Sequence, residues 1–311
     1  MFRRIIKFGD SSHVISLPKK WIDKNNLKKG DLVVCNEETN ELRILPHIAD
    51  FKQNAKEITI TLTENDKGRV KHKISSAYVN NYGLINIIAD DLLIFVQEIR
   101  IATSNLMALE IIQQTSKKIV LKDFLDIKEI SIIDTIRRID LILLSISEDV
   151  LKSLSGFDLL EGIKQKEMDV NRLSFLLWKV LKKCSDNKVR QILDVTHDEV
   201  LFYWDIVLNL ERIADNFKRL PRYVDGKLSD LKVEFVKDLI EIYKLIMKAF
   251  YKSDLDIAVK IKEEIKEMFI NSEKVFSGHG NSIMSEKIKN ILQGTSNIAT
   301  QIILFPSEKR Y

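Results

Sequence analysis

One stretch, Leu208-Asn209-Leu210-Glu211-Arg212-Ile213-Ala214-Asp215-Asn216, decides most of the fold. It lies in a run from His197 to Arg219 that contains neither proline nor glycine, and apolar residues recur along this run every three or four positions. That spacing predicts a long amphipathic helix.

Two carboxylates of this helix occupy an unusual place. Glu211 and Asp215 are four residues apart and therefore share one face. With successive residues about 100° apart, they fall on an apolar side, about a third of a turn from the polar side. The apolar side carries Val200, Trp204, Val207, Leu208 and Ala214, and the polar side carries Asp198, Asp205, Asn209, Arg212 and Asn216. Carboxylates in apolar surroundings need a cation, a hydrogen-bond donor or a metal ion.

The preceding helical run repeats this arrangement. Glu167 and Asn171 are also four residues apart and also have apolar neighbours. If the two helices pack antiparallel, the two polar pairs face each other, and such oxygen-rich clusters hold hard or borderline metal ions. The alternative is that a neighbouring basic side chain, such as Arg172 or Lys218, neutralises the carboxylates.

Long helices are expected throughout residues 124–311, because the whole chain of 311 residues has only 4 prolines and 10 glycines. We expect about six long helices and almost no strand. Three helices before Pro221 and three after it predict a duplicated three-helix unit. The expected breaks are Ser155-Gly156, Asp186-Asn187, Pro221 to Gly226, Ser253-Asp254 and Ser277 to Gly280.

The middle segment, residues 50–123, alternates between strand-like and helix-like runs. Strands are expected at 58–62, 84–89, 107–113 and 118–121, and helices at 66–81 and 91–103. This pattern predicts a small α/β unit, and its role is not readable from the sequence.

Residues 1–48 form the third kind of segment. The expected order is a strand over 2–8, a strand over 13–17, a short helix that Pro18 opens at its first position, and strands over 32–35 and 42–45, closed by Pro46. So small a unit cannot bury much core, and it has neither a disulfide nor a metal pattern. It should therefore be stabilised by a second copy of itself.

Basic residues of this module are the candidates for contact with DNA phosphates: Arg3, Arg4, Lys7, Lys19 and Lys20. Segment 1–48 has nine basic and six acidic residues, a net charge of +3 that a dimer doubles. The alternative is that these side chains only solvate a module whose role is dimerisation.

The pattern Lys7-Phe8-Gly9-Asp10-Ser11-Ser12-His13-Val14-Ile15-Ser16-Leu17-Pro18-Lys19-Lys20-Trp21, followed by Leu27-Lys28-Lys29-Gly30-Asp31, resembles the AbrB/SpoVT swapped-hairpin family. The resemblance implies that two chains interleave their hairpins into one dimer whose basic residues face DNA. Ser12 and His13 complete the expected DNA-binding set. His13 departs from the family pattern, because many DNA-binding members have an arginine there, and a histidine is mostly neutral at pH 7.

The stretch around Glu211 resembles the L-E-R-I-x-D-H/N motif of the PhoU family of phosphate-uptake regulators, and Glu167-Met168-Asp169-Val170-Asn171-Arg172-Leu173 resembles its companion stretch. The resemblance implies two three-helix bundles and iron or zinc held by acidic motifs. Here the implied ligands are Glu167, Asn171, Glu211 and Asp215, in the first bundle.

Departures from the PhoU pattern confine the expected metal to that bundle. Asn171 stands where an aspartate is usual, which removes one anionic ligand. In the second half, Asn297-Ile298-Ala299-Thr300 carries no carboxylate in the place of the second acidic motif, and only Glu263 and Glu267 remain on the helix before it.

Together these features predict a multi-domain α+β protein. Its parts are a swapped-hairpin β module (1–48), a small α/β domain (50–123) and two three-helix bundles (124–221 and 227–306). This order resembles a class of archaeal-type phosphate regulators. It implies a dimeric, DNA-binding transcriptional regulator of phosphate uptake whose helical region senses or relays a signal, with a phosphate-transporter ATPase subunit or a sensor kinase as partner. The alternative is an adaptor that dimerises through the N-terminal module and acts by protein contacts.

Other classes of protein are disfavoured. The chain has no phosphate-cradling glycine loop, no G-x-S-x-G motif and no paired histidines, so we do not expect an enzyme. Two distant cysteines and the lack of a signal peptide favour the cytoplasm. No run reaches about 18 apolar residues, so no membrane span is expected.

Overall fold

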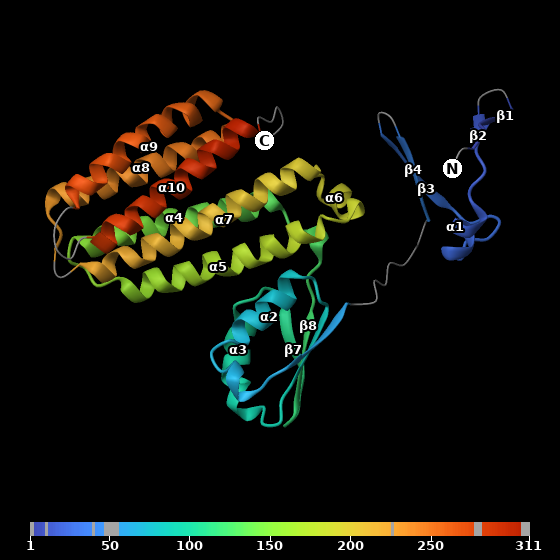
Figure 1. The fold of residues 1–311 in the computed structure, drawn as a ribbon, viewed down its shortest axis with the longest axis horizontal. Helices are drawn as coiled ribbons and strands as arrows, with labels where there is room; N and C mark the ends of the chain where they lie inside the picture. Colours follow the sequence, from blue (N-terminus) through green and yellow to red (C-terminus); the bar gives the residue numbers. More distant parts are fainter. Residues whose placement is uncertain are drawn as a thin grey trace. The chain divides into compact units, whose positions relative to one another are not determined.

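The computed structural model describes residues 3–9, 12–38, 41–46, 56–224, 227–276 and 282–305. The chain divides into two compact units, 1–54 and 55–311 (Figure 1). The first is a small β-rich module, and the second combines an α/β domain with long helices. A mixed α+β class with mainly helical content is thus confirmed.

The first unit contains two separate hairpins and one short helix. β1 (Ile6–Phe8) pairs antiparallel with β2 (Ser12–Val14), and β3 (Val33–Glu38) pairs antiparallel with β4 (Glu41–Pro46). Helix α1 (Lys19–Lys24) lies between the hairpins, and Pro18 precedes it as the N-cap rather than taking the first helical position. The second strand is shorter than the 13–17 predicted, since β1 provides a partner only up to Val14.

This unit lacks a core of its own among its described residues. None of the side chains described between Arg3 and Ile44 is buried. Its exposed large apolar side chains are Ile5, Ile6, Phe8, Val14, Ile15, Leu32 and Leu42. A two-stranded sheet is marginally stable alone in water, so hairpins with uncovered apolar residues need another surface to pack against.

The α/β domain is a four-stranded sheet with two helices. Its strands are β5 (Glu57–Thr61), β6 (Leu84–Ile88), β7 (Leu109–Gln114) and β8 (Lys118–Asp123), in the order β5-β6-β8-β7. β5 and β6 are parallel and the other pairs are antiparallel. Helices α2 (Val70–Val79) and α3 (Val96–Ser104) cover one face, and the core between helices and sheet includes Ile74, Ile85, Ile99 and Leu121 (Figure 1).

Both helices of this domain start later than predicted. A 3₁₀ turn, Glu64–Asp66, is followed by Gly68 with φ of +76°, and α2 begins only after it. A left-handed residue cannot continue an α-helix, which explains why the predicted 66–81 helix is shortened. Before α3 the chain forms a second 3₁₀ turn, Leu93–Phe95.

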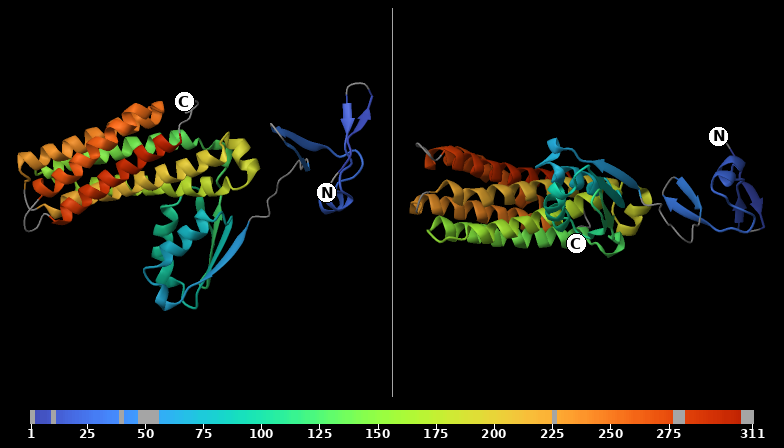
Figure 2. Two further views of the ribbon diagram at one scale, coloured as in Figure 1. Left: turned by 45° about the horizontal axis from the view of Figure 1, so that its top comes forward. Right: turned by 90° about the horizontal axis from the view of Figure 1, so that it is seen from below.

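After the α/β domain, the described part of the chain contains six long helices, one short helix and the 3₁₀ turns Ile127–Glu129 and Leu220–Tyr223 (Figures 1 and 2). The long helices are α4 (Ile132–Leu154), α5 (Leu160–Lys183), α7 (His197–Arg219), α8 (Asp230–Lys252), α9 (Leu255–Val275) and α10 (Ser282–Leu304). The expected break at Asp186-Asn187 is present, and it is followed by an additional short helix, α6 (Asn187–Leu193), which Asp186 caps by accepting from the backbone N–H of Lys188. The predicted break at Ser277 to Gly280 lies outside the described residues.

One continuous apolar core runs through these helices. Helices α4, α5 and α7 pack against one another, as do α8, α9 and α10, and α7 also lies along α10. Gly294 allows this close approach, since a Cβ there would lie 2.8 Å from Cγ1 of Ile213. None of the helices described is long and apolar enough to span a membrane.

A buried lysine joins the α/β domain to helix α5. Lys179 is only 1% exposed, and its Nζ lies 2.9 Å from Oδ2 of Asp123 and donates to the carbonyl oxygen of Tyr78 at 3.0 Å. The same ammonium lies 4.3 Å from the centre of the Tyr78 ring. Burial lowers the pKa of Lys179, and the charge of Asp123 opposes that shift.

Candidate functional site

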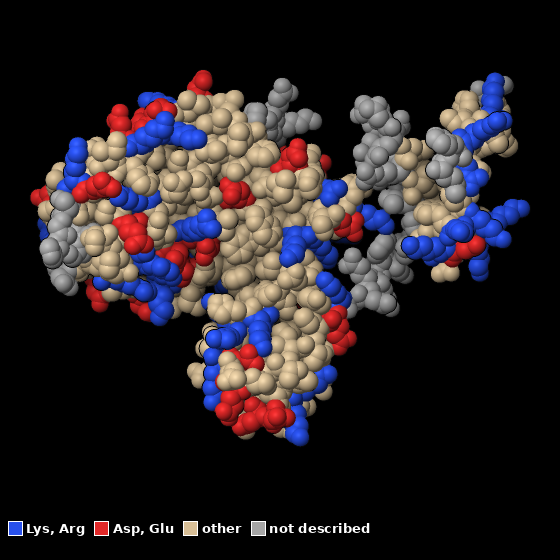
Figure 3. Space-filling model, in the orientation of Figure 1, with Lys and Arg blue, Asp and Glu red and all other residues tan. Residues whose placement is uncertain are grey.

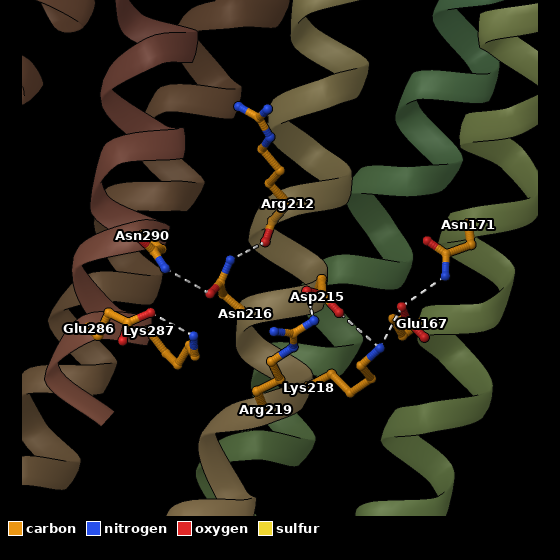
Figure 4. Close-up of polar contacts among 10 residues, drawn as sticks. All are labelled: Glu167, Asn171, Arg212, Asp215, Asn216, Lys218, Arg219, Glu286, Lys287 and Asn290. Atoms are coloured by element: carbon orange, nitrogen blue, oxygen red, sulfur yellow. Dashed lines mark hydrogen bonds and ion pairs between the residues drawn. The ribbon is translucent and has the colours of Figure 1, made fainter. Parts of the chain in front are cut away.

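An acidic cluster lies where α5 and α7 pack together (Figure 4). Nζ of Lys218 lies 2.7 Å from Oε1 of Glu167 and 3.0 Å from Oδ1 of Asp215, so one ammonium joins the two helices. Asn171 donates from Nδ2 to Oε1 of Glu167 at 2.8 Å. Nη2 of Arg219 lies 2.7 Å from Oδ2 of Asp215. The structure therefore brings three of the four predicted residues into one polar network.

Glu211 borders this network without joining it. It forms neither a hydrogen bond nor an ion pair with any residue that the structure describes. Burial raises the pKa of its carboxyl group, and the negative charges of Asp215 and Glu167 raise it further. Glu211 is thus the least compensated carboxylate of the cluster, and its charged form benefits most from an added cation.

The residues can be tested for their fit to the iron or zinc that the PhoU resemblance implies. A metal ion would need the oxygens of Glu167 and Asp215 that Lys218 already contacts, and Asn171 turns a donor rather than an acceptor toward Glu167. Within the described ranges, no group of three or more His, Cys, Asp and Glu residues is arranged to hold a metal. The arrangement matches the alternative in which a lysine neutralises the carboxylates, while metal binding stays a prediction.

Part of the polar side of α7 is buried against α10. Asn209 is only 1% exposed, and its Oδ1 accepts from Nδ2 of Asn297 on α10 at 3.0 Å. Seven residues further along α7, Asn216 accepts from Asn290, at 3.4 Å. Asn209 and Asn216 therefore face α10, because α7 packs against helices of both groups.

In the second group of helices, the matching positions hold no acidic cluster among the described residues. Glu263 and Glu267 of α9 are exposed, and Glu263 pairs with Lys266 at 2.8 Å. The hydroxyl of Thr300 on α10 accepts from Nζ of Lys262 on α9 at 2.9 Å, so in this contact between the two helices the acceptor is a neutral hydroxyl and not a carboxylate. The first group of helices therefore has an acidic cluster with a shared lysine, and the described residues of the second group have none at the corresponding positions.

The basic residues predicted to contact DNA are exposed, and Figure 3 shows Lys and Arg side chains on the described surface of the first unit. Arg3, Arg4, Lys7, Lys19 and Lys20 form no ion pair with another described residue. Lys7 lies directly opposite His13 in the hairpin, so their side chains share one face. The hydroxyl of Ser12 donates to the carbonyl oxygen of Phe8 at 2.7 Å, which closes the hairpin. Within the described part of this unit, Ser12 is the one member of the predicted DNA-binding set whose side chain forms a hydrogen bond.

No family model, curated protein or solved structure matches the chain. The function is therefore inferred from the chemistry of these residues and from the motifs quoted from the sequence.

Sequence reasoning missed a second buried acidic site. Asp140 of α4 is 6% exposed and accepts from the hydroxyl of Tyr243 at 2.7 Å and from that of Tyr251 at 3.0 Å, both on α8. Burial raises the pKa of Asp140, and the two tyrosine hydrogen bonds and Arg137 oppose the shift. The signal that could have revealed it is an aspartate between Ile139 and Leu141 in the apolar run of α4.

Proposed function

We propose that this chain is a dimeric, DNA-binding transcriptional regulator of phosphate uptake, whose helical region senses or relays a signal. The observation that carries the DNA-binding part is the composition of the first unit's surface. It exposes basic side chains without ion pairs next to apolar side chains without a core. The first set suits a polyanion, and the second suits a second copy of the module.

Dimerisation follows from the two hairpins. Each exposes large apolar residues, such as Phe8 in β1 and Leu42 in β4. Interleaving the hairpins of two chains would cover these side chains and make one sheet-rich body from four hairpins. The same association doubles the net charge of +3 of residues 1–48. It would place two sets of Arg3, Arg4 and Lys7 on one dimer.

The phosphate-uptake part of the proposal rests on the motif helix α7. The sequence around Glu211 carries the PhoU-like motif, and α7 contacts α4, α5 and α10. A charge change at the acidic cluster therefore acts on a helix that packs within both groups of helices. A phosphate-transporter ATPase subunit or a sensor kinase is the proposed partner of this region.

The test is a salt titration of DNA binding by the full chain, using fragments of its own genome. Affinity should fall steeply with salt, since each phosphate contact contributes a log–log slope of about −0.9. Arg4→Ala or Lys7→Ala removes two contacts from a dimer and should make the slope shallower by about 2. Lys248→Ala, an exposed lysine of α8, is the matched control and should leave the slope unchanged. Failure to bind any fragment at low salt would exclude the DNA-binding function.

The second candidate is an adaptor that dimerises through the first unit and acts by protein contacts. It is favoured by His13, which shares a face with Lys7 and stands where many DNA-binding members of the AbrB/SpoVT family have an arginine. A stable dimer that retains no DNA but co-purifies with a transporter ATPase subunit or a sensor kinase would establish this alternative.

A further inference from the structure

A cavity of about 520 Å³ lies between the α/β domain and helix α5. Most of its wall comes from the end of α3 and the start of β7, and Arg172 of α5 completes it. Pockets of about 300–1,000 Å³ are typical of small-molecule sites. The volume is therefore that of a metabolite-sized ligand rather than of a single ion.

Two arginines from different elements line this cavity. Arg100 of α3 forms no ion pair or hydrogen bond with any described residue. Arg172 has one long contact, 3.7 Å from its Nη1 to Oδ1 of Asp169, and its buried Nε has no hydrogen-bond partner. The side chain of Arg172 is 42% exposed and its one ion pair is long, so its terminal guanidinium nitrogens remain available to an anionic group that the described part of the chain does not supply.

The other residues that line the cavity determine which chemical groups a ligand can carry beside its anionic group. Leu106, Met107, Leu109 and Ile111 provide an apolar surface. The hydroxyls of Thr103 and Ser104 donate to the carbonyl oxygens of Ile99 at 2.8 Å and of Ile101 at 3.0 Å, so neither is available as a donor to a ligand. Glu110 also borders the cavity but pairs with neither arginine within the described part of the chain. The donors facing a ligand are thus the two guanidinium groups.

We propose that this cavity binds a small organic oxyanion, a phosphate or carboxylate carried on a partly apolar body. Guanidinium groups bind such oxyanions through paired hydrogen bonds. The ligand would touch both the α/β domain and α5, next to the Tyr78 hydroxyl that donates to the carbonyl oxygen of Met107 at 3.0 Å. Binding would therefore strengthen the junction that Lys179 already holds. The site does not depend on the proposed DNA-binding function.

The experiment measures binding to the full chain by calorimetry and thermal unfolding. The probes are AMP, glycerol 3-phosphate, hexanoate and benzoate, with adenosine and inorganic phosphate as controls for the body and the anion alone. At least one organic oxyanion should bind and raise Tm, and should bind at least tenfold more tightly than both controls. The comparison of AMP and glycerol 3-phosphate with hexanoate and benzoate distinguishes phosphate from carboxylate.

Variants assign the binding to the two arginines. Arg100→Ala and Arg172→Ala should each weaken binding at least tenfold, and Arg172→Lys should weaken it less than Arg172→Ala because the charge remains. Arg138→Ala, an exposed arginine of α4 outside the cavity, is the matched control and should bind like the wild type. The proposal is overturned if all four organic probes fail to bind, if adenosine binds equally well, or if Arg100→Ala binds like Arg138→Ala.

Discussion

The two units of this protein differ in whether they bury their apolar side chains. The second unit has two apolar cores of its own, one under the sheet and one along the helices. The first unit has no buried side chain among those described, and its apolar residues are exposed. The difference teaches that the second unit has the cores that a single chain needs to be stable, whereas the first unit would gain a core through the dimerisation proposed above.

The largest expected effect is the loss of dimerisation when an exposed apolar residue of the first unit is replaced. Phe8→Asp places a charge on the exposed apolar surface of β1 and should abolish dimerisation, because an interface cannot bury an unpaired carboxylate. Analytical ultracentrifugation should show a monomer, and DNA binding should be lost with the dimer. Ile192→Asp, at a similarly exposed apolar residue of α6, is the control and should leave the association unchanged. A dimer that survives Phe8→Asp would place the interface elsewhere.

The next largest effect is a loss of stability in the second unit, where the buried Lys179 joins the α/β domain to helix α5. Lys179→Met removes the ammonium that pairs with Asp123 and should lower the free energy of unfolding by about 3 kcal/mol, since breaking a buried pair leaves its partner uncompensated. Urea unfolding measures the loss. Lys248→Met, at an exposed position of α8, should change it by less than about 0.5 kcal/mol. Equal stability of the two variants would mean that the buried pair does not fasten the α/β domain.

The same contrast shows how far the sequence could be read. The six long helices α4, α5 and α7 to α10 were predictable because long runs with little glycine and proline leave little choice, whereas the short helix α6 was not predicted. Which side of α7 meets water was not predictable, since Asn209 is buried only because α10 packs over it. The spacing of Glu167/Asn171 and of Glu211/Asp215 suggested two polar pairs on facing helices, but the contacts of Lys218 with Glu167 and Asp215 depend on a side-chain conformation that crosses from α7 to α5. Lys179 lies in the apolar run Leu177-Trp178-Lys179-Val180-Leu181, and that setting is the signal that it is buried.

A metal-binding measurement sharpens the comparison within the helical region. Lys218 supplies the positive charge that a metal ion would bring, so Lys218→Met should bind Zn²⁺ at least tenfold more tightly than the wild type. Adding Glu211→Ala and Asp215→Ala to that variant should remove the gain. Zinc and iron content of the purified proteins and Zn²⁺ titrations provide the readout. Stoichiometric metal in the wild type, lost in Glu211→Ala/Asp215→Ala, would instead support the metal site predicted from the sequence.

The smallest effect tests how the helices of the second unit are joined. Because burial raises the pKa of Asp140, the folded state holds its proton more tightly than the unfolded state does. Its contribution to stability is therefore complete below the unfolded pKa and is lost as pH rises through the folded value.

Asp140→Asn cannot ionise but keeps a side chain that can bond to Tyr243 and Tyr251. Relative to this variant, the wild type should lose stability as the pH rises from 4 to 7, because its carboxyl group ionises less readily in the folded state. Chemical unfolding of both proteins across this range gives the difference, in which the other titrating groups cancel. A constant difference would show that Asp140 ionises as easily in the folded chain as in the unfolded one, and that the two tyrosine hydrogen bonds fully offset its burial.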